Sequence, residues 1–154
     1  MDEQYLHRDI LKVFPWIKPR TLISWSERGL VKPLGKAYGR GSARVYSYSN
    51  LVEIGIISEL LSFGMPFTII GNIMTSKSMR LIITNRNFDT VFWFCRELVN
   101  AKVPMNQGPP WGAIYGFGTL DEFAIEGRKT TSAIIIKLEG IKRFVDGQIR
   151  NLNR

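Results

Sequence analysis

The chain has 154 residues, of which 45% are hydrophobic and 22% are charged, a composition that supports a buried core and argues against intrinsic disorder. Lysines and arginines number 21 against 13 acids, which gives a net charge of +8 and predicts a polyanionic partner. No segment approaches the roughly 18 apolar residues of a membrane span, and the N-terminus lacks the pattern of a secretory signal. We therefore expect a soluble, cytoplasmic protein without a membrane partner.

The residues available for metal binding or catalysis are few. The chain has one cysteine, Cys95, and one histidine, His7, which excludes an internal disulfide and a conventional zinc site. The carboxylates Asp121, Glu122 and Glu126 flank an expected strand without an obvious acid-base partner. We predict no metal, no other cofactor and no catalytic residue, and hence a protein that is not an enzyme.

Two short helices are expected at the start of the chain. Apolar residues recur at helical spacing from Tyr5 to Phe14, and Pro15 blocks continuation of that helix. A second helix is predicted from Pro19 to Glu27, because proline suits a first helical turn and Gly29 supplies the left-handed residue beyond the end. Only a tight turn separates the two, which predicts a helix-turn-helix.

The segment from Leu30 to Tyr48 reads differently. It contains several glycines and ends in an alternating run typical of a strand. We predict a two-stranded hairpin, called the wing below, with its tip at Tyr38–Ser42.

Two further helices complete the first half. Ser49 is a plausible N-cap for a third helix with an apolar stripe, which ends at Gly64. A fourth helix is expected from Pro66 to about Met74. A polar stretch follows, so we expect one domain over residues 1–75 and a second over residues 79–154.

The second half mixes strand-like and helical segments. A helix is predicted at Asp89–Asn100, although its apolar start would also suit a strand, and a final amphipathic helix is predicted at Gly140–Leu152. The expected strands are Leu81–Thr84, Ala113–Phe117, Glu122–Ile125 and Ser132–Leu138. The whole chain is thus assigned to the α+β class, a winged helix-turn-helix followed by a small α/β domain.

Positive charge is concentrated in the predicted second helix and wing. Between Lys18 and Arg44 there are seven basic residues and one acid, Glu27. Side chains on the first turns of a helix that points into the major groove can reach base edges and phosphates, and positive side chains on a wing suit the backbone or minor groove. The predicted DNA-contacting residues are Lys18, Arg20, Thr21, Ser24, Trp25 and Arg28 in the helix and Lys36, Arg40, Arg44 and Tyr46 in the wing. For Trp25, packing in the core is an equal alternative.

Several short motifs in the first half follow a known order and spacing. They are Thr21-Leu22, Glu27-Arg28-Gly29-Leu30, Arg44-Val45-Tyr46-Ser47, Leu51, and Leu60 to Gly64 followed by Ile69 or Ile73. Over about Tyr5–Met74 the chain resembles the MerR-type winged-helix DNA-binding domain. The resemblance implies a homodimeric transcription regulator, with the second helix in the major groove and the wing on the backbone. It also implies a DNA-contact role for Arg44 and Tyr46.

The expected partners are double-stranded DNA, a second copy of the chain and, through the C-terminal half, a small-molecule or protein effector. An aromatic group that includes Phe92, Trp93 and Tyr115 would suit an effector pocket, with core or dimer packing as the more ordinary use. Two other functions stay open. One is an architectural or excisionase-like factor that bends DNA, and the other is a ligand- or protein-binding adaptor that acts through the C-terminal half.

Overall fold

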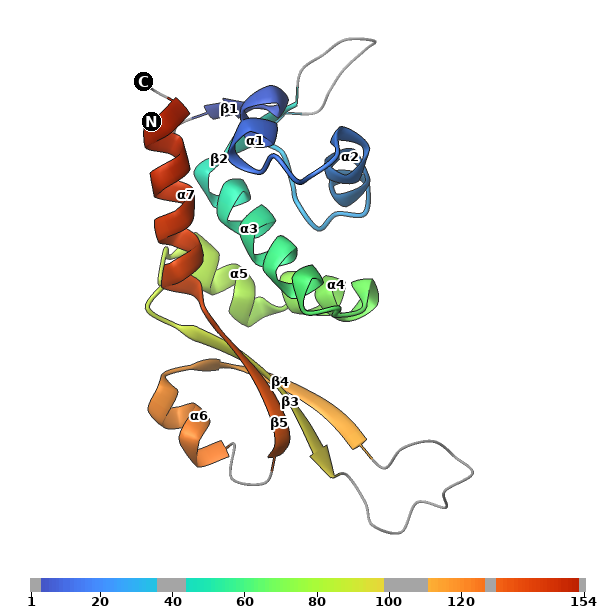
Figure 1. Ribbon diagram of the computed structural model, residues 1–154, viewed down its shortest axis with the longest axis vertical. Coiled ribbons are helices and arrows are strands. Elements are labelled where there is room, and N and C mark those ends of the chain that lie inside the picture. Colours follow the sequence, from blue (N-terminus) through green and yellow to red (C-terminus); the bar gives the residue numbers. More distant parts are fainter. Residues whose placement is uncertain (1–3, 36–43, 99–110, 127–129, 153–154) are drawn as a thin grey trace. The chain divides into compact units, whose positions relative to one another are not determined.

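The computed structural model describes residues 4–35, 44–98, 111–126 and 130–152. It divides into two compact units, the first formed by residues 1–86 and 140–154 and the second by residues 87–139. The first unit thus continues past the boundary expected near Thr75, and it also includes the last helix. The architecture is α+β, as predicted, and Figure 1 shows its elements in chain order.

A helix-turn-helix opens the first unit. Helix α1 (His7–Val13) is followed by α2 (Pro19–Glu27), and the bounds of α2 are those predicted. Pro19 occupies its first turn, where the missing N–H has no partner to lose. Gly29 has a φ of 72°, which ends the helix in the left-handed conformation expected of a glycine at that position.

The strand pairing differs from the predicted hairpin. Strand β2 (Val45–Ser47) pairs antiparallel with β1 (Gln4–Leu6), which precedes α1, with Tyr5 opposite Tyr46. The segment that enters the wing contacts β2 through a hydrogen bond from the Leu34 amide to the Val45 carbonyl, 2.8 Å long. Pro33, just before it, has no N–H to donate to a ladder. The predicted tip, Tyr38–Ser42, lies outside the described residues.

Three helices follow the wing. Helix α3 (Tyr48–Ser62) is capped by Ser47, not Ser49: the Ser47 hydroxyl accepts from the Asn50 amide, and the Asn50 side chain accepts from the Ser47 amide. Helix α4 (Phe67–Thr75) begins one residue after the predicted start at Pro66, which is its N-cap. Helix α5 (Lys77–Thr84) replaces the expected strand at Leu81–Thr84.

Helix α5 forms in place of a strand because of its N-cap and the spacing of its buried side chains. The Ser76 hydroxyl accepts a hydrogen bond from the Met79 amide, 3.2 Å away. Met79, Ile82 and Ile83 are buried at the spacing of one helical face, whereas Leu81 is 48% exposed.

The last helix, α7 (Leu138–Leu152), returns to the first unit and lies beside α3 (Figure 1). Val145 and Ile149 on its apolar face are buried. A Cβ atom built on Gly55 of α3 would lie 2.6 Å from Cγ2 of Ile141, closer than real Cβ contacts. The absence of a side chain at Gly55 thus allows α7 to pack directly on the backbone of α3.

The second unit is a three-stranded antiparallel sheet with one helix. Its strands are β3 (Val91–Leu98), β4 (Trp111–Gly118) and β5 (Thr130–Lys137), in the order β4-β3-β5. Helix α6 (Leu120–Glu126) contributes Phe123 to a core that contains Val91, Trp93 and Cys95. Cys95 is 1% exposed, and a buried thiol packs as a small apolar side chain.

Two predictions in the second unit are wrong. The predicted helix at Asp89–Asn100 is strand β3, the alternative that its apolar start allowed. The predicted strand at Glu122–Ile125 is helix α6, because a local cap competes with strand pairing: the Thr119 hydroxyl accepts from the Glu122 amide, and the Glu122 carboxylate accepts from the Thr119 amide. This reciprocal arrangement is the capping box that starts helices.

Candidate nucleic-acid interface

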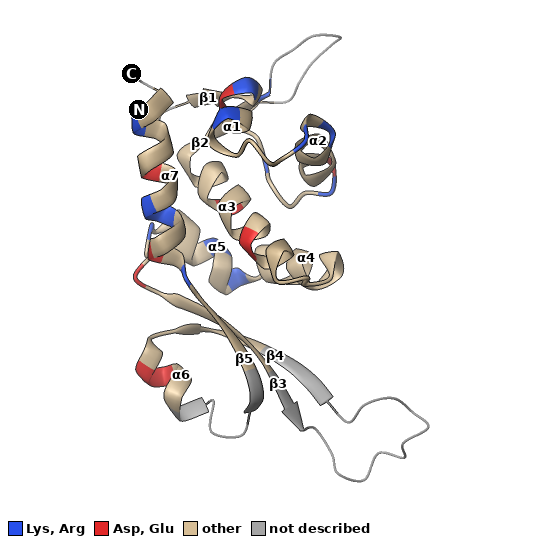
Figure 2. Cartoon of the chain, in the orientation of Figure 1, with Lys and Arg blue, Asp and Glu red and all other residues tan. Residues whose placement is uncertain are grey.

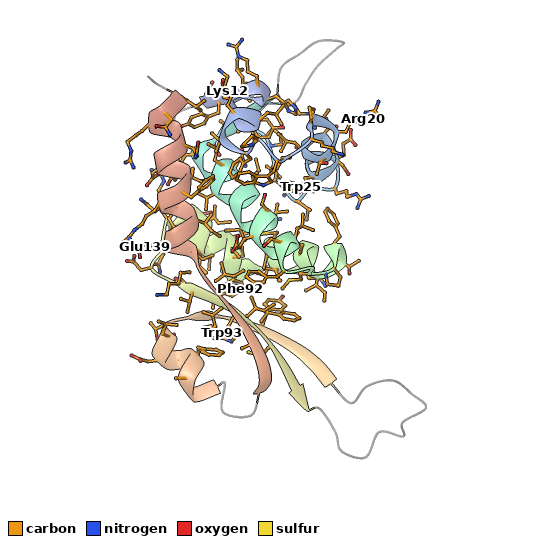
Figure 3. All side chains as sticks on the ribbon, in the orientation of Figure 1. Lys12, Arg20, Trp25, Phe92, Trp93 and Glu139 are labelled. Carbon is orange, nitrogen blue, oxygen red and sulfur yellow. The ribbon has the colours of Figure 1, made fainter. Side chains whose placement is uncertain are left out.

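Helix α2 has one buried and one solvent-facing side. Leu22 and Trp25 are 0% and 4% exposed, whereas Lys18 and Arg20 are exposed. In Figure 3, Arg20 points away from the first unit and Trp25 points inward among the neighbouring helices. The structure thus presents the positive residues of the N-terminal end of α2 to solvent, as a recognition helix requires.

The remaining predicted residues of α2 extend this surface. Thr21 and Ser24 are partly exposed, and Arg28 is exposed. The Arg28 guanidinium lies 4.8 Å from the centre of the Phe67 ring, close enough for a cation–π contact. Figure 2 shows Lys and Arg on α2 and on α1, with Glu27 as the acid of α2.

Arg44 connects the end of the wing to α2. Its Nη1 donates a hydrogen bond to the Ile23 carbonyl, 3.2 Å away, and its Nη2 lies 3.7 Å from the Glu27 carboxylate. The side chain is 23% exposed. These contacts give Arg44 a role within the fold that the sequence did not indicate.

Tyr46 and Trp25 are buried. For Tyr46 this corrects the predicted place on a DNA-contacting surface, and for Trp25 it favours packing in the core, the alternative that the sequence left open. Tyr46 is 0% exposed, and its hydroxyl lies 3.5 Å from Nδ1 of His7. Burial and the positive charge of Arg44 both lower the pKa of His7. Lys36 and Arg40 lie outside the described residues.

An exposed aromatic residue close in sequence to the positive surface was missed. Trp16 is 59% exposed and precedes Lys18 by two positions, in the turn between α1 and α2. The sequence could have indicated that Trp16 is exposed, because Trp16 lies between Pro15 and Pro19, outside the apolar stripe of either helix. Its neighbour in space is Phe144 of α7, with ring centres 5.7 Å apart.

A small cavity of about 170 Å³ adjoins the end of α2. Lys32, Glu53 and Arg80 contribute the charged part of its lining. Burial raises the pKa of Glu53, against the effect of a hydrogen bond donated by Asn50 and of the charges of Arg80 and Lys32. Elsewhere, the described residues contain no group of three His, Cys, Asp or Glu side chains placed to hold a metal ion.

Within the described part of the chain, no helix is both long and apolar enough to cross a membrane. No curated protein sequence matches the chain. Residues 17–77 match the family model described as MerR HTH family regulatory protein, a span that runs from the turn before α2 to the start of α5. The matched family is a regulatory, DNA-binding family and not an enzyme family. Residues 17–77 are therefore similar to the MerR-type helix-turn-helix, and the match supports a role in DNA-binding transcription regulation.

Proposed function

We propose that the protein is a homodimeric transcription regulator that binds specific double-stranded DNA with the N-terminal end of α2 in the major groove. The observation that carries the proposal is the division of α2 described above. Its apolar side chains are buried, while Lys18, Arg20, Thr21 and Ser24 remain accessible. In this proposal Thr21 and Ser24 contact base edges, and Lys18 and Arg20 contact bases or phosphates.

The wing contributes contacts to the backbone. Lys36 and Arg40 lie between the described ends of the wing in the sequence, and we assign them to phosphates or the minor groove. Arg44 acts differently in this proposal, because its guanidinium is engaged by Ile23 and Glu27. It holds the base of the wing against α2, so that both elements meet the duplex together.

The binding test starts with selection of duplexes from a random pool, followed by titration of the selected duplex at several salt concentrations. Each lost phosphate contact lowers the slope of log affinity against log salt by about 0.9. Arg20→Ala is expected to weaken binding and, if Arg20 contacts a phosphate, to flatten this slope. Lys77→Ala is the control, because it removes an exposed positive charge from the first turn of α5, outside α2 and the wing. A wild-type affinity that is independent of salt would contradict the proposal.

Dimerisation is assigned to the second unit. Its three-stranded sheet leaves β4 and β5 as edge strands, and edge strands offer unpaired backbone groups to a second copy. Ile135 of β5 is 40% exposed. We expect Ile135→Lys to convert a dimer into a monomer in light scattering and to weaken DNA binding, since two half-sites must be held together. A monomeric wild-type protein that binds its duplex fully would contradict this assignment.

A further inference from the structure

Helix α7 contacts the turn of the helix-turn-helix through three aromatic rings. The centre of the Phe144 ring lies 5.9 Å from that of Phe14 and 5.7 Å from that of Trp16. Phe14 and Trp16 also meet edge to face, with their centres 5.7 Å apart and their planes at 87°. Phe14 is fully buried, and Phe144 is 36% exposed. Phe144 therefore packs against the short segment that sets the start of α2.

A second contact joins α7 to the first residue of α3. The Tyr48 hydroxyl donates a hydrogen bond to Oδ1 of Asp146, 2.7 Å away, and Nζ of Lys142 lies 2.7 Å from Oδ2 of the same carboxylate. The Arg86 guanidinium lies 5.4 Å from the centre of the Tyr48 ring. Because Tyr48 directly follows β2, this contact fixes the place where the wing leaves for α3.

The close approach at Gly55 completes the attachment. Ile141 occupies the space that a side chain at Gly55 would fill, so α7 is held at Ile141, Phe144 and Asp146. These three residues lie within about two turns of α7 and contact α3 and the turn between α1 and α2.

We propose that α7 is a positioning element for DNA recognition: Phe144 fixes the N-terminal end of α2 through Phe14 and Trp16, and Asp146 fixes the junction between wing and α3 through Tyr48. This inference rests on the proposed function, because it assigns a role in the same DNA interface. Recognition side chains must be held to within about 0.5 Å by the residues behind them. The N-terminal end of α2 receives that support from a helix about 120 residues further along the chain.

The DNA test compares Phe144→Ala with Asn151→Ala, which changes an exposed residue of the same helix. Both are made in the full chain, and each is titrated with the selected duplex and with a scrambled duplex. Phe144→Ala is expected to lower the ratio of specific to non-specific affinity by about ten-fold, because base contacts need exact placement and phosphate contacts do not. The salt slope for the scrambled duplex should be unchanged, and Phe144→Tyr should restore the ratio.

A purely structural role would give a different result. The fraction of protein able to bind would fall, and the affinities of the remaining molecules for both duplexes would be unchanged or would fall equally. Either outcome overturns the proposal. If Phe144→Ala fails to fold, Tyr48→Phe tests the second contact, since it removes only the hydroxyl that Asp146 accepts from. The expected result is again a lower specificity ratio with the fold retained.

A measurement without DNA separates this proposal from the function it rests on. Amide hydrogen exchange in residues 17–24 reports how firmly the start of α2 is held. Exchange there should become faster in Phe144→Ala and stay unchanged in Asn151→Ala. Unchanged exchange in both would overturn the role of α7 even if the protein binds DNA. Failure of the wild-type protein to bind any selected duplex would overturn the DNA-binding function itself.

Discussion

Arg44 shows how one side chain can serve the fold where a contact with a partner was expected. Its guanidinium donates to the Ile23 carbonyl and is 23% exposed, and a hydrogen bond from a charged donor contributes about 1.5–3 kcal/mol. Arg44→Ala should therefore lower the free energy of unfolding by about that amount in urea titrations. Glu27→Gln is the control, because Glu27 is 65% exposed and an exposed ion pair contributes at most about 1 kcal/mol. If the stability of Arg44→Ala is unchanged and the salt slope of its DNA binding is flatter, Arg44 contacts a phosphate instead.

Asp146 should make the stability of the first unit depend on acid pH. Burial alone raises its pKa, but hydrogen bonds from Lys142 and Tyr48 and the charges of Lys142 and Arg150 outweigh burial and lower the pKa below the ordinary 3.8. A carboxyl whose pKa is lowered by folding stabilises the fold fully above its unfolded pKa. That contribution is lost as the pH falls through the folded pKa, below about 3.8.

The corresponding measurement is thermal unfolding of wild type and Asp146→Asn between pH 7 and pH 3. The wild type should be more stable at neutral pH, and the difference should shrink as the pH drops below the usual aspartate range. A difference that stays constant over this interval would show that the charge of Asp146 is not the stabilising feature.

The residues that could not be placed from the sequence are those whose environment depends on a distant partner. Helical spacing puts Leu22 and Trp25 on one side of α2, and both are buried. For Tyr46 the sequence did not show which side of its strand is buried, because that depends on the strand with which it pairs. That partner is β1, about 40 residues earlier, and Tyr46 is fully buried.

Among the elements, the contact between α3 and α7 gives the sharpest prediction. Gly55→Ala places a methyl group 2.6 Å from Cγ2 of Ile141, on a branched side chain with little freedom to move. Overpacking of this kind costs about 1–3 kcal/mol, which exceeds the gain of about 1 kcal/mol from replacing glycine by alanine within a helix. The variant should be destabilised, and Ile141→Ala in the same chain should remove the clash.

Gly71→Ala is the matched control for that change. Gly71 also lies within a helix, α4, but a Cβ atom there would meet Leu30 at 3.7 Å, an ordinary contact. The substitution should leave the urea midpoint unchanged or raise it. Equal destabilisation by both substitutions would mean that the close approach of α7 is not what requires glycine at position 55.

Elements with explicit start and stop residues could be predicted, and short apolar runs could not. Pro19 and Gly29 mark the limits of α2, and its predicted bounds are correct. The runs Leu81–Thr84 and Glu122–Ile125 are too short to show a period of either kind. Their helical state is decided by the caps at Ser76 and Thr119. Strand β3 is apolar on both faces at its start, which is why a helix was predicted although a strand also fitted.

For the whole molecule, the first unit is built from two separate stretches of chain. A chain that ends after Glu139 would lack α7 and would expose the surfaces that Val145 and Ile149 bury. Each such apolar side chain contributes about 1.5–3 kcal/mol when fully buried. We expect the truncated chain to unfold at a distinctly lower temperature in a calorimetric scan. An unchanged transition would show that residues 4–86 are stable without α7.

The amphipathic stripe of α7 was visible in the sequence, but its destination was not. A stripe shows that a helix packs against something, and it does not identify the surface that it covers. The position of α7 after the strands of the second unit favoured packing within that half. Its contacts with Phe14, Tyr48 and Gly55 place it with the first unit instead.

The return of α7 to the first unit bears on how the protein is made. The contact between Tyr48 and Asp146 joins residues 98 positions apart, so it cannot form while the ribosome still holds the later part of the chain. Domains that are continuous in sequence can fold as soon as they emerge. Here the segment with the helix-turn-helix must wait for residues 140–152, and the sheet of residues 87–139 is free to assemble first. DNA-binding competence should accordingly appear only after residues 140–152 have left the ribosome.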